Sequence, residues 1–228
     1  HNREALNAAG EYFSRTDARG PWSDNPGTGP GGGAADLACR RSYTLLVTDG
    51  GWNDKTPPRR FGHYTTRWGS APFNADSVTG PTLTGSGSQA GRSYTYRPND
   101  ERAISGTAGA QNNTFSDAAF YYWSRDLRPD LPNIRSPKRW PGATGETYPA
   151  DYQDPSTWQN MTTMVIAYGL PEYLSEDFFL TRLRTGGAVD WPLVNFEALD
   201  ATKTADTQRG ALVSRGSYYS ANNADELA

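Results

Sequence analysis

Cysteine and histidine are almost absent from this chain of 228 residues, which has 1 Cys and 2 His. The single cysteine, Cys39, excludes an internal disulfide and a thiolate metal cluster. With only His1 and His63, neither a histidine-rich metal site nor a Ser-His-Asp triad is easy to assemble, because no carboxylate is placed to orient His63. Cys39 leads into an apolar run, so we expect a buried free thiol, or a pairing with another chain if the protein is secreted.

Long apolar runs and clusters of basic residues are also missing. No stretch approaches the length of a membrane-spanning helix, and none has the pattern of a signal peptide. Lys and Arg form no stripe and the formal net charge is -3, so the composition gives no support for nucleic-acid binding. Because the sequence begins with His1 rather than Met, we expect a processed product or a piece of a longer chain.

Aromatic residues, glycine and proline are plentiful instead. Aromatics make up 12% of the chain, with 24 Gly and 16 Pro, while hydrophobic residues make up only 36%. Disordered chains are poor in aromatics, so this composition predicts a folded protein with a modest core and long, ordered, aromatic-rich loops. The glycine-rich stretch 21–35 lacks the Lys-Ser/Thr of a phosphate-binding loop and is expected to be a connector.

The pattern of apolar residues predicts an α/β fold. Two apolar runs, 43–48 and 161–168, predict strands buried on both faces. Helices are predicted over 2–15, 114–127, 172–184 and 203–214, with a short strand over 216–221. Helices that alternate with buried strands indicate a parallel sheet. The strands are too few to close a stable core, so we expect part of a doubly wound domain whose first strands are missing.

The helix over 114–127 has the clearest boundary signal. Thr114 and Asp117 have the spacing of a capping box. Its predicted buried stripe consists of Phe115, Ala118, Ala119, Tyr122 and Trp123.

We expect one partial domain over 1–228 with two long insertions. Residues 50–113 lack helical periodicity and predict a β-rich insertion, in which 64–68 and 93–97 are strands joined by the Ser/Gly-rich link 78–91. Residues 128–157 predict a long, ordered, proline-rich loop.

The most informative motif is Asp49, which follows the apolar run 43–48 and precedes Gly50 and Gly51. Parallel strands present their carboxyl ends to the ligand crevice of an α/β sheet. Glycine lets the backbone approach a ligand closely. Asp49 is therefore a candidate ligand or metal group, and the alternative is that it only caps the following turn.

A rival motif is the Asp-x-Thr-x-Thr pattern over 200–204. Its carboxylate and hydroxyl oxygens suit Mg²⁺. Its place in the chain order instead favours Asp200 as a helix N-cap.

Several segments, taken in order, resemble the PilY family of type IV pilus tip adhesins and assembly proteins. They include Thr-Asp-Gly-Gly-Trp-Asn at 48–53, Asp-Pro-Ser-Thr-Trp-Gln-Asn-Met at 154–161 and Asp-Trp-Pro at 190–192. The segments 39–43, 115–128 and 214–221 also match, so the resemblance spans most of the chain. The chain departs from the family at Gly51, where an aromatic residue is usual, and lacks the Asp-Leu-Trp-His run before the last helix.

The resemblance implies a von Willebrand factor A-like, doubly wound domain of a large exported protein. Asp49 matches the acidic residue that ends a strand and contributes to a metal-ion-dependent adhesion site, which implies a divalent cation, Mg²⁺ or Ca²⁺. The Asp-x-Ser-x-Ser loop and the later Thr of that site are not found in their expected places. The metal site is therefore expected to be incomplete in this chain.

The resemblance also implies a function without catalysis. We expect a module at the pilus tip or outer cell surface, exported through the periplasm, that binds minor pilins or the tip complex and a host or surface ligand. Trp52 and Asn53 are binding candidates. Further aromatic contact area would come from Trp22, Trp68, Tyr94 and Tyr96, unless these pack against the domain's own loops.

Two alternatives stay open. The first is a glycosidase-like surface hydrolase with paired carboxylates from Asp151, Asp154, Glu172 or Glu176, although nothing in the sequence fixes a pair. The second is a structural fragment that folds only beside a polypeptide that holds the missing strands, and whose bare sheet edges would otherwise aggregate.

Overall fold

The computed structural model describes residues 2–26, 35–50, 74–105, 111–138, 154–197 and 201–221. The elements in chain order are α1 (Asn2–Phe13), β1 (Tyr43–Thr48), β2 (Thr82–Thr84), the 3-10 turn η1 (Gly87–Gln89), β3 (Ser93–Thr95), α2 (Arg102–Ser105), α3 (Phe115–Trp123), β4 (Thr162–Tyr168), α4 (Glu176–Thr185), α5 (Ala201–Val213) and β5 (Tyr218–Ala221). Within these ranges no helix combines the length and the apolar character that crossing a membrane requires.

The main sheet is parallel and has the strand order β1-β4-β5. In its register Leu45 is paired with Met164, and Val165 with Tyr218. Each parallel step along the chain passes through at least one helix, as a βαβ connection requires. The predicted α/β class with a parallel sheet is confirmed.

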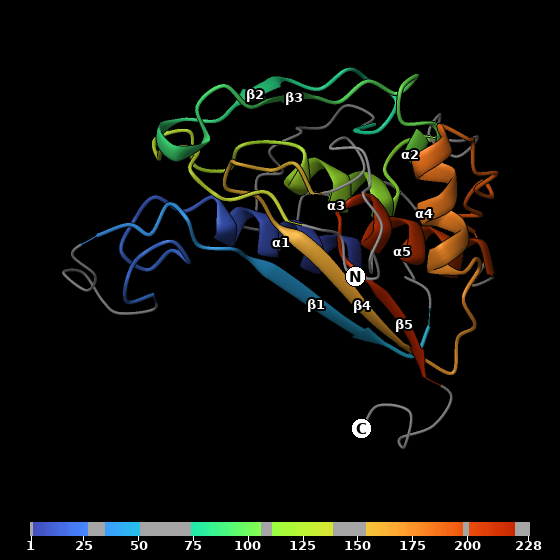
Figure 1. Cartoon of the computed structure of the whole chain (residues 1–228). Helices are drawn as coiled ribbons and strands as arrows, with labels where there is room; N and C mark the ends of the chain where they lie inside the picture. The colour runs from blue at the N-terminus through green and yellow to red at the C-terminus, as the bar shows by residue number, and fades with distance from the viewer. Residues whose placement is uncertain are drawn as a thin grey trace.

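The described elements form layers (Figure 1). Helices α1, α3 and α5 lie on one side of the sheet, and the β2-β3 hairpin lies beyond α3, on the side away from the sheet. The sheet is therefore an outer layer of the described part of the chain. A doubly wound sheet carries helices on both faces, so that finer part of the predicted fold stays a prediction.

The prediction that 43–48 is a strand is confirmed, but the prediction that both its faces are buried is wrong for the described chain. Exposure alternates along β1, where Leu45 is 58% and Val47 63% exposed, whereas Leu46 packs against the helices. The reason is position: β1 has one neighbouring strand, and the described helices cover one face of the sheet.

The central strand β4 has a neighbour on each side, but over its second half it too is fully buried on one face only, because Met164 and Ile166 are partly buried and Tyr168 is 44% exposed. Val165 and Ala167 are fully buried under α5, in a cluster with Ala211 and Tyr218. Cys39 is exposed in the turn that precedes β1, so the prediction of a buried thiol is wrong.

Helix α3 begins where the sequence predicts. The Thr114 side chain accepts from the Asp117 N–H and the Asp117 side chain accepts from the Thr114 N–H, which completes the capping box. The helix ends at Trp123, shorter than predicted. The predicted stripe is buried, and Phe120 outside that stripe is buried as well. The cause is that α3 lies between two hydrophobic clusters and has no solvent face of any width.

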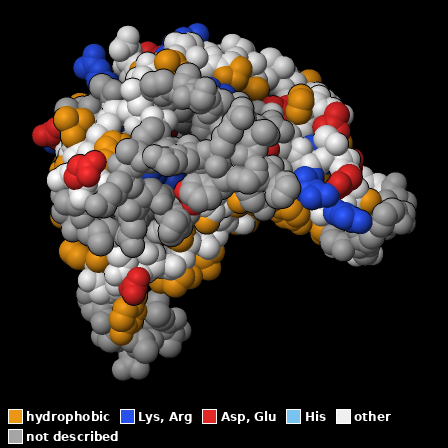
Figure 2. All heavy atoms as spheres, turned by 180° about the vertical axis from the view of Figure 1, so that it is seen from behind, with side chains coloured by type: hydrophobic (Ala, Val, Ile, Leu, Met, Phe, Trp, Pro, Cys, Tyr) orange, Lys and Arg blue, Asp and Glu red, His pale blue; other side chains and the backbone are white. Residues whose placement is uncertain are grey.

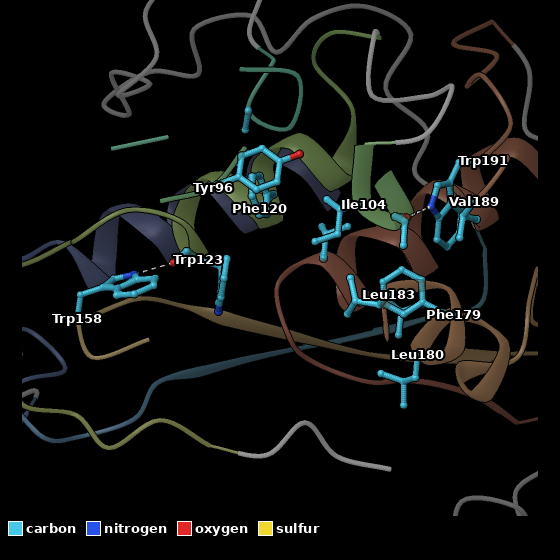
Figure 3. Packing of buried hydrophobic residues seen from close by; sticks show 14 residues of the cluster. Tyr96, Ile104, Phe120, Trp123, Trp158, Phe179, Leu180, Leu183, Val189 and Trp191 are labelled. Atoms are coloured by element: carbon cyan, nitrogen blue, oxygen red, sulfur yellow. Dashed lines mark hydrogen bonds between the residues drawn. The ribbon is translucent and has the colours of Figure 1, made fainter. Parts of the chain in front are cut away.

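The largest hydrophobic cluster lies on the side of α3 and α5 away from the sheet, and Figure 3 shows its packing. Six of its 14 buried residues are aromatic and come from loops and helices: Tyr96, Phe120, Trp123, Trp158, Phe179 and Trp191. The Trp158 indole N–H donates to the Trp123 carbonyl at 2.9 Å, and the Trp191 N–H donates to the Ala103 carbonyl at 2.9 Å. Aromatic residues from loops therefore join residues of α3, α4 and α5 in this core.

This packing supports the alternative in which these aromatic residues pack within the chain rather than form a contact surface. Trp22 and Tyr96 are fully buried, and Trp22 donates to the Phe13 carbonyl at 2.6 Å. Tyr94 is partly buried and stacks on Trp158 with ring centroids 5.6 Å apart. Trp68 lies outside the described residues.

The hairpin in the predicted β-rich insertion uses an unexpected partner strand. β3 lies within the predicted strand 93–97, but it pairs with β2, which lies in the segment predicted to be a link. Thr82 and Thr95 face each other across the hairpin, with their hydroxyls 2.7 Å apart. The predicted strand 64–68 lies outside the described residues, so the extents of both insertions stay predictions.

Gly216 lies where the chain turns from α5 into β5, and it allows a close backbone approach. A Cβ there would lie 1.9 Å from the Thr163 carbonyl oxygen, whereas a Cβ at Gly50 would meet nothing within 4 Å. The Gly216 N–H also donates to the Ala211 carbonyl at 2.9 Å, which closes the end of α5.

We expect Gly216→Ala to lower the free energy of unfolding by about 1–3 kcal/mol, because β4 must shift to admit the methyl group. Urea denaturation followed by tryptophan fluorescence measures the loss. Gly50→Ala is the matched control and should change stability by less than about 0.5 kcal/mol. Equal effects of the two substitutions would contradict the described packing of β4 against the end of α5.

Candidate functional site

Asp49 lies immediately after β1, at the carboxyl edge of the parallel sheet, and its side chain is exposed. The turn that follows is closed by the Thr48 hydroxyl, which accepts from the Gly50 N–H at 3.2 Å and donates to the Gly50 carbonyl at 2.6 Å. Thr48 therefore supplies the cap that the sequence alternative assigned to Asp49. The Asp49 carboxylate is placed at the edge where α/β sheets bind ligands.

The described residues do not complete a metal site at this edge. Within the described ranges, no group of three or more His, Cys, Asp or Glu side chains could hold a metal ion. Ca²⁺ takes six to eight oxygen ligands and Mg²⁺ takes six, so one carboxylate is insufficient. The binding candidates Trp52 and Asn53, and the rival Asp200, lie outside the described residues.

Within the described residues, a dense set of charged groups lies in the interior, where α5 packs against α3. We call it the Arg209 cluster, and its members are Asp76, Ser116, Asp117, Asp206 and Arg209. All five side chains are buried. Asp206 and Arg209 are three residues apart on α5, so both point toward the same neighbour.

Asp206 caps the start of α3 from another helix. Its carboxylate accepts from the Phe115 N–H at 2.7 Å, from the Ser116 N–H at 3.2 Å and from the Ser116 hydroxyl at 2.6 Å. The first N–H groups of a helix have no partner within it, and its N-terminus carries a partial positive charge. A carboxylate there binds the unpaired donors and is favoured by the helix dipole.

Arg209 joins four segments through one guanidinium group. It forms an ion pair with Asp76, donates to the Ile104 carbonyl at 2.6 and 3.0 Å, to the Ser105 carbonyl at 3.1 Å and to the Ser116 hydroxyl at 3.1 Å. The planar guanidinium has five N–H donors in a fixed fork, which suits several acceptors at once. The predicted insertion is thereby fastened to both helices.

Asp117 fastens the same insertion from α3. Its carboxylate accepts from the Ala75 N–H at 2.9 Å, in addition to the Thr114 groups of the capping box. Burial raises the pKa of the Asp117 carboxyl to about 6, against the opposing effect of these donors. Burial also raises the pKa of Asp76 well above its usual range, despite the adjacent Arg209. Burial therefore opposes the ionised form of both carboxyl groups, whereas Arg209 and the backbone donors stabilise it.

A second buried arginine holds the hairpin. Arg215 forms an ion pair with Glu101 at 2.8 Å, and its guanidinium lies 4.5 Å from the centre of the Trp123 ring. The Tyr94 hydroxyl donates to Glu101 at 2.6 Å. Arg215 has φ +61, a left-handed conformation that is uncommon outside glycine. At this position the left-handed backbone places the Arg215 guanidinium beside Glu101 and Trp123.

These two clusters are structural in character, because burial excludes a substrate from them. The hydrolase alternative gains no support from the geometry either. Asp154 is buried and accepts from the Ser156 hydroxyl at 2.5 Å, with Arg41 at 3.5 Å. Glu172 is exposed, and Asp151 lies outside the described residues.

Sequence reasoning missed the Arg209 cluster, because the polar sequence of α5 is typical of a surface helix. One signal was available: Asp206, Arg209 and Gly210 lie on one side of the helix. A Cβ at Gly210 would lie 2.5 Å from the Phe115 ring, so glycine permits the approach that brings Asp206 and Arg209 to α3.

Three curated proteins are similar to this chain. The type IV pilus biogenesis factor PilY1 of Pseudomonas aeruginosa strain PAK is 30% identical over 237 residues, which cover 99% of this chain and 18% of that protein. PilY1 of strain PAO1 is 31% identical over 241 residues, with the same coverage. PilY1 of strain UCBPP-PA14 is 28% identical over 203 residues, which cover 83% of this chain and 15% of that protein.

The chain therefore spans less than a fifth of the length of the curated relatives it matches. No family model matches it, and no solved structure matches it.

Arg209→Met should destabilise the protein by about 3–5 kcal/mol, because it leaves buried Asp76 without its ion-pair partner. Arg97→Met is the matched control. Arg97 and Asp100 are 4.0 Å apart and both largely exposed, so their pair contributes about 0–1 kcal/mol. Equilibrium urea unfolding measures both. The double variant Asp76→Asn, Arg209→Met should recover part of the loss, and equal losses at Arg209 and Arg97 would contradict the cluster's role.

Stability should fall as pH rises from about 4 to about 7. The pKa of Asp117 is raised from 3.8 to about 6 in the folded chain, so in that window the folded state binds more protons than the unfolded state. Stability then decreases with pH, by on the order of 1–3 kcal/mol for this group. Urea unfolding at a series of pH values should give a smaller slope for Asp117→Asn than for the exposed control Asp100→Asn. Identical slopes would show that Asp117 titrates normally.

Proposed function

Because the chain is a relative of the PilY family of type IV pilus biogenesis factors along nearly its whole length, we propose that it acts in pilus biogenesis as a non-catalytic assembly module. The observation that carries the proposal is the 30–31% identity over 99% of the chain. The buried arginine clusters support it, because they hold long loops in fixed positions, as a binding scaffold requires.

The partners we propose are proteins of the pilus, namely minor pilins or the complex at the pilus tip. The proposed location is the outer cell surface, reached through the periplasm. Both rest on the relatives, which are biogenesis factors of type IV pili.

Adhesion to a host or surface ligand is the finer form of this proposal. It rests on a von Willebrand factor A-like, doubly wound fold, which the parallel order β1-β4-β5 supports. In that fold Asp49 would contribute one ligand to a Mg²⁺ or Ca²⁺ ion, with Trp52 and Asn53 beside it. The exposure of Asp49 at the carboxyl edge supports this role, and the remaining ligands would come from beyond the described residues.

Deletion of the region that encodes these residues should abolish surface pili, counted by electron microscopy, in the organism that carries the gene. A complementing copy with Arg97→Met should restore them, and one with Arg209→Met should not, because that variant is unfolded or unstable. Normal pilus numbers after the deletion would contradict the proposed role.

Asp49→Ala separates assembly from adhesion in the same experiment. We expect normal pilus numbers, since the exposed side chain stabilises nothing in the described fold, together with loss of surface attachment that depends on Mg²⁺ or Ca²⁺. Attachment equal to that of the unsubstituted protein, with or without chelator, would contradict the adhesion site but leave the assembly role intact.

A further inference from the structure

Two buried carboxyl groups of the Arg209 cluster are joined through two hydroxyl groups. Thr114 Oγ1 lies 3.0 Å from Asp117 Oδ2 and 3.0 Å from Ser116 Oγ. Ser116 Oγ in turn lies 2.6 Å from Asp206 Oδ1. We call these four oxygens the hydroxyl relay, and it connects α3 with α5. Figure 2 shows other acidic side chains at separate places on the surface, whereas all four side chains of the relay are buried.

The hydroxyl relay has one hydrogen too few when both of its carboxyl groups are ionised. Its four oxygens make three contacts of hydrogen-bond length, and each contact needs one hydrogen. The Thr114 and Ser116 hydroxyls supply two hydrogens, and an ionised carboxylate supplies none. One contact then brings two oxygens together without a hydrogen between them. A proton bound to one of the carboxyl groups would supply the third hydrogen.

One bound proton also completes the hydrogen bonding of both hydroxyl groups. Ser116 Oγ already accepts from Arg209 Nη1 at 3.1 Å, and Thr114 Oγ1 accepts from the Asp117 N–H at 3.0 Å. With a proton on Asp117, each hydroxyl accepts two hydrogen bonds and donates one, which is its full capacity. All three relay hydrogen bonds then run in one direction, from Asp117 to Asp206.

The donors around each carboxyl group place the proton on Asp117 rather than on Asp206. Hydrogen bonds donated to a carboxylate favour its ionised form. Asp206 accepts from two N–H groups in the first turn of α3 and from the Ser116 hydroxyl. Asp117 accepts from two N–H groups, and burial raises its pKa to about 6. Asp117 therefore has the weaker support for its negative charge.

The charged groups on the surrounding elements also favour a bound proton. Those on the elements that pack against the relay and α3 are Arg209 and Lys203 of α5, Asp76 of the insertion, and Arg3 and Glu11 of α1. Lys203 and Arg3 donate to backbone carbonyls, and Glu11 accepts from the Tyr122 hydroxyl at 3.2 Å. Strand β4, which also packs against α3, has no charged residue.

Arg209 is thereby shared among three buried carboxyl groups, those of Asp76, Asp117 and Asp206. Burial raises the pKa of Asp76, and the charges of Asp117 and Asp206 raise it further, against the effect of Arg209. If all three groups were ionised, three negative charges would lie near this guanidinium. One proton on the relay removes one of them.

We propose that the hydroxyl relay binds one proton, carried by Asp117, and that this proton makes the contact between α3 and α5 a pH-sensitive switch whose tighter form is the protonated one. Loss of the proton removes one of the three relay hydrogen bonds and adds a buried negative charge. The same contact holds the insertion through Asp76 and the Ala75 N–H, so the insertion is held more weakly as well. This inference does not depend on the pilus function.

The direction of the pH effect follows from the position of the proton. The folded chain binds it more tightly than the unfolded chain, because the pKa of Asp117 is raised to about 6 on folding. The stabilisation is therefore fully present below about pH 4 and is lost as the pH rises through about 6.

Infrared difference spectroscopy tests for the bound proton in the polypeptide that cells make from the gene, at its natural length. A protonated carboxyl group has a C=O band that an ionised one lacks. We expect such a band to disappear with a midpoint near pH 6, to be absent in Asp117→Asn and to remain in the exposed control Asp100→Asn. Asn suits the site, because its amide can donate to Thr114 as the protonated carboxyl group would. Identical spectra of Asp117→Asn and the unsubstituted protein would overturn the proposal.

Ser116→Ala distinguishes the relay from burial alone. Without Ser116 Oγ, the Thr114 hydroxyl has no acceptor in the relay once Asp117 is protonated. The midpoint of the band should therefore fall by about one pH unit, which corresponds to the loss of one hydrogen bond. Thr207→Val is the matched control, because it removes a buried hydroxyl of α5 that donates to the Lys203 carbonyl at 2.8 Å, outside the relay.

The control should leave the midpoint unchanged. Ser116→Cys is the second variant if Ser116→Ala does not fold, and it should lower the midpoint as well, because a thiol is a weak donor and acceptor. An unchanged midpoint in the Ser116 variant that folds, or an equal shift in Thr207→Val, would overturn the proposal.

Discussion

The described fold depends most on the contacts of the Arg209 guanidinium group. It joins α5 to Asp76, to the carbonyls that end α2, and to the first turn of α3. These segments are about 90 to 130 residues away from Arg209 along the chain, and Asp76 lies in a loop outside any helix or strand. A chain with 36% hydrophobic residues has limited apolar area with which to fix such loops. The buried Arg209, which binds two backbone carbonyls, provides a second means. Arg215 holds the hairpin through its ion pair with Glu101.

Local signals made several elements predictable. The run 43–48 has a strand pattern and turn residues after it, and Thr114 with Asp117 has the spacing of a capping box, so both boundaries could be read from neighbouring residues. The relation to the PilY family was also found from short ordered motifs and is confirmed by the curated relatives. What failed depends on distant contacts. Burial of β1 depends on which layers cover the sheet, and the partner of β3 depends on a turn that sequence reasoning assigned to a link.

The candidate site divides in the same way. Asp49 was placed correctly at the carboxyl end of β1, because strand and turn patterns are local. The Arg209 cluster was missed, because its members come from four segments and its helix has the polar sequence of a surface helix. The two sites also differ in their chemical character. Asp49 is exposed and available to a ligand, whereas the carboxylates of the cluster are buried and already bound to the protein's own donors. The described interior acts as a scaffold, and the exposed candidate site is Asp49 at the carboxyl edge of the sheet.

Hydrogen exchange at the Ala75 amide tests most directly whether the Arg209 cluster unites the insertion with the helices and sheet. This N–H donates to Asp117 at 2.9 Å, and the Val165 N–H donates to the Ser217 carbonyl at 2.9 Å in the sheet. If the cluster unites these parts, both amides exchange only through the same cooperative unfolding, with protection factors within about tenfold of each other. An Ala75 amide that exchanges as fast as an exposed loop while Val165 stays protected would contradict it, because the insertion would then open independently of the core.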